Sequence, residues 1–166
     1  IVLSGTLAKC GWRPFYRKAE KKLAEEKMKR MEVWNLRKSC YRNLSGGQQQ
    51  RTLLARALCA ASKVILLDEP VTGLDPKVTA EFYQVTKDLS EEGIAVIMVS
   101  HDVEFCAKYA DLVSMFFDGS IITTNTPNRF FSQNSFYTTA ANRMSRHIFE
   151  NAITNEDVIE LCRQNL

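Results

Sequence analysis

Two short apolar runs separated by a helical pattern dominate the centre of the chain. Residues 64–67 and 94–99 are continuously apolar, which is typical of strands buried on both faces of a parallel sheet. Between them, Asp75-Pro76 is typical of a helix N-cap followed by proline at the first helical position, and Gly93 is placed to end a helix that runs to about Glu91. Strand, helix and strand in this order predict a right-handed βαβ unit, and therefore an α/β fold.

Helical periodicity also marks the segments before this unit. Residues 17–31 are rich in Lys, Glu and Ala and carry a narrow apolar stripe, which predicts a half-exposed helix. After a break at Ser45-Gly46-Gly47, residues 47–61 show apolar positions at helical spacing and predict a helix that packs on a core. The expected core-facing positions are Leu54, Ala57, Leu58 and Ala61.

The segments after the unit are more varied. We expect a helix over residues 102–109 and a hairpin over residues 112–123 that turns at Asp118-Gly119. Residues 128–150 mix aromatic and small polar residues without a clear period. Thr154 and the acidic residue three positions later predict a capped helix that runs to about Cys162.

Composition indicates an ordinary globular protein whose charge is unevenly distributed. The 166 residues are 45% hydrophobic and 25% charged, and no apolar run approaches the ~20 residues of a membrane span. Residues 1–42 carry twelve Lys/Arg against four Asp/Glu, whereas the remainder carries ten against fifteen. We therefore expect the two segments to face different partners.

The cysteines and histidines exclude several classes of site. The five cysteines are scattered and form no C-x-x-C pair, which favours a reducing compartment over a disulfide framework or a zinc site. His101 and His147 are the only histidines, so a His-rich metal site is excluded.

Residues suited to phosphate chemistry lie at four places. Ser45-Gly46-Gly47-Gln48 stands at a predicted helix start, where backbone amides and the helix dipole favour an anion, although an ordinary N-capped turn has the same pattern. Asp68-Glu69 follows a predicted buried strand at the sheet edge where α/β proteins bind ligands, and a salt-bridged strand end is the alternative. Asp75 is at least a helix cap, and His101 follows the second strand at that same edge.

The order and spacing of these four motifs resemble the ATP-binding-cassette (ABC) ATPases. Leu44 to Gln48 is similar to the family's signature motif, Val64 to Glu69 to its Walker B strand, Gly73-Leu74-Asp75 to its D-loop, and His101 to its switch histidine. The resemblance covers about residues 1–125. It implies an incomplete P-loop NTPase-like parallel sheet with a helical subdomain (residues 1–50), a catalytic half (51–125) and a C-terminal extension (126–166).

The resemblance also implies roles, cofactors and partners. Ser45, Gly46, Gly47 and Gln48 would contact the γ-phosphate of ATP bound to a second nucleotide-binding domain, and Asp75 would couple the two sites. Asp68 would hold Mg²⁺ through water, Glu69 would be the general base and His101 would contact the γ-phosphate. The expected location is cytoplasmic, peripheral on the membrane through a transmembrane permease.

One part of the family pattern is missing. No G-x-x-x-x-G-K-[ST] motif occurs in the chain, which opens at Ile1 without an initiator Met, so we expect the start of the domain to be absent. The expected consequence is negligible ATP hydrolysis by this chain alone.

Two parts of the chain resemble ATPases of transporters with different cargoes. Residues 1–43 resemble ATPases of zinc/manganese importers, whereas residues 130–144 resemble ATPases of energy-coupling-factor importers for cobalt and vitamins, with the change near residues 101–110. Metal-ion import is the first interpretation and the energy-coupling-factor class the alternative. A non-transport ABC protein acting on nucleic acid is a further alternative. Basic and acidic residues alternate along the basic segment, however, which argues against a nucleic-acid partner.

Overall fold

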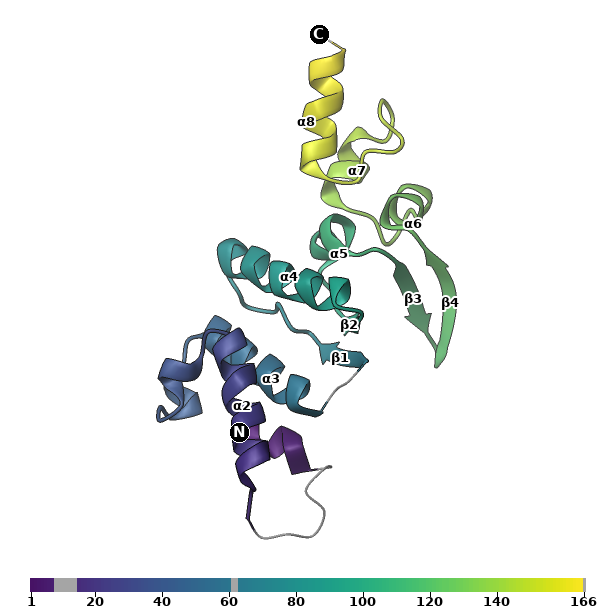
Figure 1. The fold of residues 1–166 in the computed structure, drawn as a ribbon. Coiled ribbons are helices and arrows are strands. Elements are labelled where there is room, and N and C mark those ends of the chain that lie inside the picture. The colour runs from purple at the N-terminus through teal and green to yellow at the C-terminus, as the bar shows by residue number, and fades with distance from the viewer. Residues whose placement is uncertain (8–14, 61–62, 166) are drawn as a thin grey trace. The chain divides into compact units, whose positions relative to one another are not determined.

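The computed structural model describes residues 1–7, 15–60 and 63–165, and they divide into two compact units, Ile1–Val99 and Ser100–Leu166. Figure 1 follows the elements along the chain. The first unit contains η1 (Val2–Thr6), α2 (Lys18–Arg30), η2 (Trp34–Leu36), η3 (Tyr41–Asn43), α3 (Gly46–Ala60), β1 (Val64–Asp68), α4 (Pro76–Glu91) and β2 (Ala95–Val99). The second contains α5 (Val103–Tyr109), β3 (Val113–Phe117), β4 (Ser120–Asn125), α6 (Pro127–Gln133), α7 (Ala140–Ser145) and α8 (Asn155–Gln164).

The predicted strand–helix–strand unit is present. β1 and β2 pair in parallel, with Val64 opposite Ala95 and Asp68 opposite Val99. The helix between them begins where the sequence predicts, because Asp75 accepts hydrogen bonds from the amides of Lys77 and Val78. Gly93 follows the helix with a φ of 83°, a left-handed conformation that glycine adopts without a steric penalty.

The prediction that these strands are buried on both faces is wrong for this chain. Along β1 and β2 one face is largely covered, and Ile65 is only 2% exposed. The other face is open, with Leu66 74%, Ile97 52% and Val99 62% exposed. Helix α4 packs against β2.

The helical part of the first unit packs around α3. Of the four predicted core-facing positions, Leu54 and Leu58 are at most 3% exposed, Ala57 is half-buried, and Ala61 lies outside the described residues. Ala55, which was not predicted to face the core, is fully buried. The 3-10 helix η1 lies directly on α3, since a Cβ atom on Gly5 would stand 2.1 Å from the carbonyl oxygen of Arg56. Figure 1 shows α2 beside α3, with which it is also in contact.

The second unit has its own small core around Ala107, Phe130, Phe131 and Ile153. The predicted hairpin is confirmed as β3–β4, which turns at Asp118-Gly119 with positive φ at both residues. The predicted capping box of the last helix is confirmed between Thr154 and Asp157. Helices α6 and α7 were not expected, because residues 128–150 carry no regular apolar period.

No helix among the described residues is long and apolar enough to cross a membrane. The three-part division of the sequence is not tested by the two units and stays a prediction.

Candidate functional site

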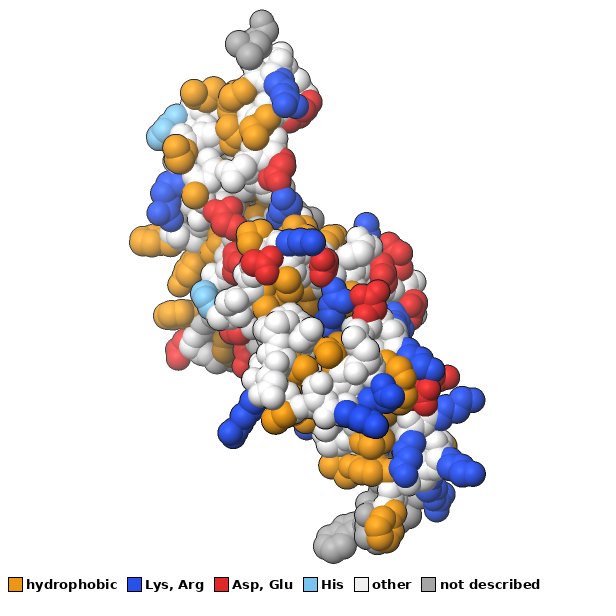
Figure 2. All heavy atoms as spheres, turned by 90° about the vertical axis from the view of Figure 1, so that its left-hand side faces the viewer, with side chains coloured by type: hydrophobic (Ala, Val, Ile, Leu, Met, Phe, Trp, Pro, Cys, Tyr) orange, Lys and Arg blue, Asp and Glu red, His pale blue; other side chains and the backbone are white. Residues whose placement is uncertain are grey.

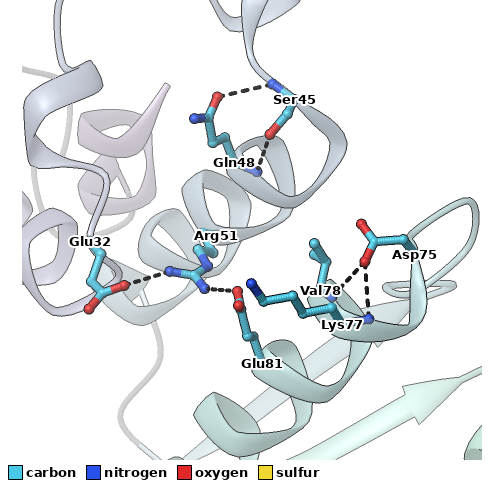
Figure 3. Close-up of polar contacts among 8 residues, drawn as sticks. All are labelled: Glu32, Ser45, Gln48, Arg51, Asp75, Lys77, Val78 and Glu81. Carbon is cyan, nitrogen blue, oxygen red and sulfur yellow. Dashed lines mark hydrogen bonds and ion pairs between the residues drawn. The ribbon is translucent and has the colours of Figure 1, made fainter.

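The Ser45–Gln48 segment forms the first turn of α3. The Ser45 amide donates to Oε1 of Gln48 at 3.0 Å, and the Gln48 amide donates to Oγ of Ser45 at 3.4 Å (Figure 3). This reciprocal pair follows the capping-box pattern and fixes the start of the helix. The Gln49 amide bonds to the Ser45 carbonyl at 2.8 Å. Capping therefore uses the third and fourth helical amides and leaves those of Gly46 and Gly47 to face an incoming anion.

The glycines of this turn are also required by packing. A Cβ atom on Gly46 would stand 3.2 Å from Cδ2 of Leu74, and one on Gly47 would stand 2.6 Å from Cγ1 of Val78. The start of α3 is therefore pressed against the loop that contains Asp75 and against the first turn of α4. Of the predicted motifs, the structure therefore brings together the Ser45–Gln48 turn and the loop that contains Asp75.

Asp68 and Glu69 stand at the carboxyl end of β1. Asp68 is exposed and Glu69 is half-buried. Glu69 has a φ of 46°, a left-handed conformation that is uncommon for a residue with a side chain and that Glu32 and Asp118 also adopt. Its amide donates to the carbonyl of Val99 at 2.8 Å, and its Oε2 accepts from Oγ1 of Thr72 at 3.0 Å. The carboxylate is thus held in one orientation at the strand end.

The two adjacent carboxylates suit Mg²⁺ better than a transition metal. Mg²⁺ takes one or two carboxylates and completes its shell with water and phosphate oxygens. Among the described residues there is no cluster of three or more His, Cys, Asp or Glu side chains that would form an all-protein metal cage. Asp68 and Glu69 therefore fit a magnesium ion that arrives with a phosphate ligand.

Asp75 and His101 occupy the starts of two other helices. The Oδ1 atom of Asp75 caps α4, with bonds of 3.0 and 3.1 Å to the amides of Lys77 and Val78. His101 is exposed and belongs to the second unit, directly before the N-cap residue of α5, Asp102.

Three contacts of this region were not predicted from sequence. Thr72 orients Glu69, and Arg51 forms ion pairs with Glu32 at 2.7 Å and Glu81 at 2.6 Å (Figure 3). Arg51 carries no sequence signal for either pair, because its partners are 19 and 30 residues away. The pairs tie α3 to the end of α2 and to α4.

Comparison with known proteins places this arrangement in a family. A family model described as "AAA domain, putative AbiEii toxin, Type IV TA system" matches residues 14–107, more than half of the chain. A "Putative ABC transporter ATP-binding protein" of Bacillus anthracis is 38% identical over 154 residues, which is 93% of this chain and 28% of that protein. The chain belongs to the ABC ATP-binding proteins.

Other relatives agree on the family, and one of them is named for an amino-acid cargo. A probable amino-acid ABC transporter ATP-binding protein of Haemophilus influenzae is 46% identical over 89 residues, covering 54% of this chain and 35% of that protein. The structure of cbiO1 from Clostridium perfringens, described as part of the ABC transporter complex cbiONQ, has a TM-score of 0.66 and 25% identity over 89% of this chain and 57% of that one.

These matches confirm the α/β ABC ATPase fold and the resemblance of the sequence to the ABC ATPases. They also show that the chain corresponds to part of an ABC ATPase domain, spanning about 28% of the length of the first Bacillus relative. That single match of 154 residues includes the region near residues 101–110 where the two cargo resemblances change over. One relative therefore accounts for both ends of the chain, and neither the zinc/manganese nor the energy-coupling-factor assignment is confirmed.

Proposed function

We propose that this chain is the ATP-binding and ATP-hydrolysing part of an ABC transporter subunit. The observation that carries the proposal is the capped glycine turn of α3, packed against the Asp75 loop in the same unit that holds Glu69 at the end of β1. The family's four motifs thus occur in order, three of them within one compact unit.

The α3 turn would act on a nucleotide held by a second nucleotide-binding domain. The amides of Gly46 and Gly47 point along the helix axis, and the helix dipole adds partial positive charge at this end. The exposed Ser45 hydroxyl adds a donor, and Gln48 fixes the turn. ATP is the nucleotide that the names of the relatives indicate.

Glu69 is proposed as the general base of hydrolysis. Its carboxylate, to which Thr72 donates a hydrogen bond, would accept a proton from an attacking water. Asp68 would support Mg²⁺ through water, and the ion would supply charge stabilisation at the phosphates. His101 is proposed to contact the γ-phosphate and Asp75 to couple the two sites.

The proposed partners are a second nucleotide-binding domain and a transmembrane permease. The neighbour cbiO1 is described as part of a transporter complex, which supports this assignment. The chain would then be cytoplasmic and peripheral at the membrane. Relatives named as amino-acid transporters do not support a metal ion as the cargo. We therefore propose that the cargo is a solute of an ABC transporter, without assigning its chemical class.

The test is ATP hydrolysis by this chain assembled with a nucleotide-binding domain that supplies a P-loop. We expect Glu69→Gln to lower kcat by roughly 10²–10⁴ because it removes the base, while a fluorescent ATP analogue still binds. Glu91→Gln is the matched control, since it removes a carboxylate from the exposed end of α4. Full activity in Glu69→Gln would overturn the assignment.

For the chain without that partner we make a separate prediction. Because no Walker A motif occurs in its sequence, we expect negligible phosphate release from Mg²⁺-ATP. Stoichiometric turnover that Glu69→Gln abolishes would contradict this expectation but would support the role of Glu69.

A further inference from the structure

A tight turn joins Glu69, proposed above as the general base, to Thr72. The Thr72 amide donates to the Glu69 carbonyl at 3.4 Å, and the Thr72 hydroxyl donates to Oε2 of Glu69 at 3.0 Å. The backbone and the side chain of Thr72 therefore both contact Glu69. Because a hydroxyl has one proton to donate, the carboxylate of Glu69 engages the donor of Thr72.

Packing fixes the place from which Thr72 donates. Val71, the residue before it, is only 5% exposed and anchors the turn in the core. The Leu74 amide donates to the Val71 carbonyl at 3.1 Å. The Leu74 side chain also lies against the first turn of α3, where a Cβ atom on Gly46 would stand 3.2 Å from it. The loop on both sides of Thr72 is therefore held, although Thr72 itself is exposed.

The two side chains differ in flexibility, which suits threonine to this position. Branching at Cβ restricts χ1 of Thr72, so little rotational freedom is lost when its hydroxyl bonds. Glu69 has a longer and more flexible side chain, and a general base needs a defined direction toward the proton it accepts. The Glu69 amide is bonded to the Val99 carbonyl at 2.8 Å. That bond fixes where the side chain starts, and the Thr72 hydroxyl fixes where it ends.

The bond from Thr72 differs from the ion pairs of the first unit. Figure 2 shows Lys and Arg side chains gathered over the part of this unit that contains α2. Lys29 pairs there with Glu25, and Arg30 pairs with Glu92, in exposed contacts that salt screens. A neutral hydroxyl instead gives a carboxylate direction, and replacing it with an apolar group leaves the charge of the surface unchanged.

We propose that Thr72 is a positioning residue that directs the Glu69 carboxylate toward the attacking water during ATP hydrolysis. The proposal rests on the function proposed above, in which Glu69 is the general base. Thr72 would act by raising the fraction of time that the carboxylate spends in the productive orientation. This role needs no contact between Thr72 and the nucleotide. Its loss should therefore lower kcat and leave the KM for ATP unchanged.

The experiment measures ATP hydrolysis by the chain assembled with a nucleotide-binding domain that supplies a P-loop. Thr72→Val keeps the shape of the side chain without the donor, and we expect kcat to fall about tenfold at unchanged KM. Thr72→Ser keeps the hydroxyl and should stay within about threefold of the wild type. Thr124→Val is the matched control and should keep the wild-type kcat. It removes an exposed hydroxyl that lies 2.8 Å from Oγ of Ser114, on the hairpin of the second unit.

A double variant tests whether Thr72 acts through Glu69. If it does, Thr72→Val in the Glu69→Gln background should lower the remaining single-turnover rate no further, because the base is already absent. Salt gives a second test, since the ratio of the Thr72→Val and wild-type kcat values should stay the same when NaCl is raised. Circular dichroism checks that each variant is folded, and Thr72→Ala, with the same expected loss, replaces Thr72→Val if that variant is not.

Three results would overturn the positioning role of Thr72. They are a wild-type kcat in Thr72→Val, a kcat in Thr72→Ser as low as in Thr72→Val, and a further tenfold loss in the double variant. A difference that disappears at high salt would also overturn it, because it would assign the effect to the charged surface. Full activity in Glu69→Gln would instead overturn the general-base role of Glu69, so the two failures are distinguishable.

Discussion

At the scale of single residues, the glycine pair of α3 is required by packing and is proposed to bind an anion. Its missing side chains let α3 approach the Asp75 loop and α4, and its amides would face the anion. The same two residues thus join the turn that would bind the nucleotide to the Asp75 loop that would couple the two nucleotide sites.

We predict that Gly47→Ala destabilises the chain by about 1–3 kcal/mol in urea unfolding, because the added Cβ would stand 2.6 Å from Val78. Gly46→Ala is the control, with a smaller loss, since its 3.2 Å neighbour is the tip of the flexible Leu74. Val78→Ala combined with Gly47→Ala should recover part of the loss. Equal losses in the Gly47→Ala and Gly46→Ala single variants would show that packing is not the cause.

At the scale of elements, α4 connects the signature turn to the sheet. Its start is capped by Asp75, it packs against β2, and Arg51 reaches it from α3 through Glu81. A second link comes from Arg30 at the end of α2, which forms two bonds with Glu92 at 2.6 and 2.8 Å. Part of the basic segment therefore pairs with the acidic segment within the unit, instead of facing a different partner.

Removal of the α4 cap has a defined cost. We predict that Asp75→Ala lowers the free energy of unfolding by about 1 kcal/mol, because two helix amides lose their acceptor. Asp75→Asn should stay close to the wild type, since Asn caps equally well. If Asp75→Asn keeps stability but lowers ATP hydrolysis in the assembled protein, the charge has a role beyond capping. Equal stability of Asp75→Ala and wild type would contradict the capping role.

At the scale of the whole molecule, each unit closes through contacts distant in sequence. In the second unit, Lys108 of α5 is hydrogen-bonded to Glu156 of α8. That hydrogen bond raises the pKa of Lys108 and lowers the pKa of Glu156. Both side chains are largely exposed, so the contribution to stability is small and is screened by salt.

The pH dependence of this pair follows from the opposite directions of the two pKa shifts. Glu156 contributes stability above its ordinary pKa of 4.5, and this is lost as the pH falls through its lowered pKa. Lys108 contributes below its ordinary pKa of 10.5, and this is lost as the pH rises through its raised value. We predict that Glu156→Gln lowers Tm at pH 7 and low salt, with the difference disappearing in acid and in 1 M NaCl. A difference that persists in acid would assign it to packing.

Local signals in the sequence determined the elements and the family. The Asp75 cap, the Gly93 stop, the Asp118-Gly119 turn and the Thr154 capping box each act within a few residues, so each was predictable. The motif order identified the ABC class for the same reason, because each motif is contiguous. Helices α6 and α7 were missed, because α7 buries small and polar residues and so shows no apolar period.

Only the tertiary structure decided which distant residues meet and which faces stay open. The contacts of Arg51 with Glu32 and Glu81 join three segments through space, and no spacing rule encodes them. Continuous apolarity predicted two covered faces for β1 and β2, yet coverage depends on neighbouring elements and not on the strands themselves. The outward side of α7 is likewise decided only in three dimensions, because hydrogen bonds from Asn142 to the carbonyls of Glu150 and Ala152 fix which side of the helix is buried.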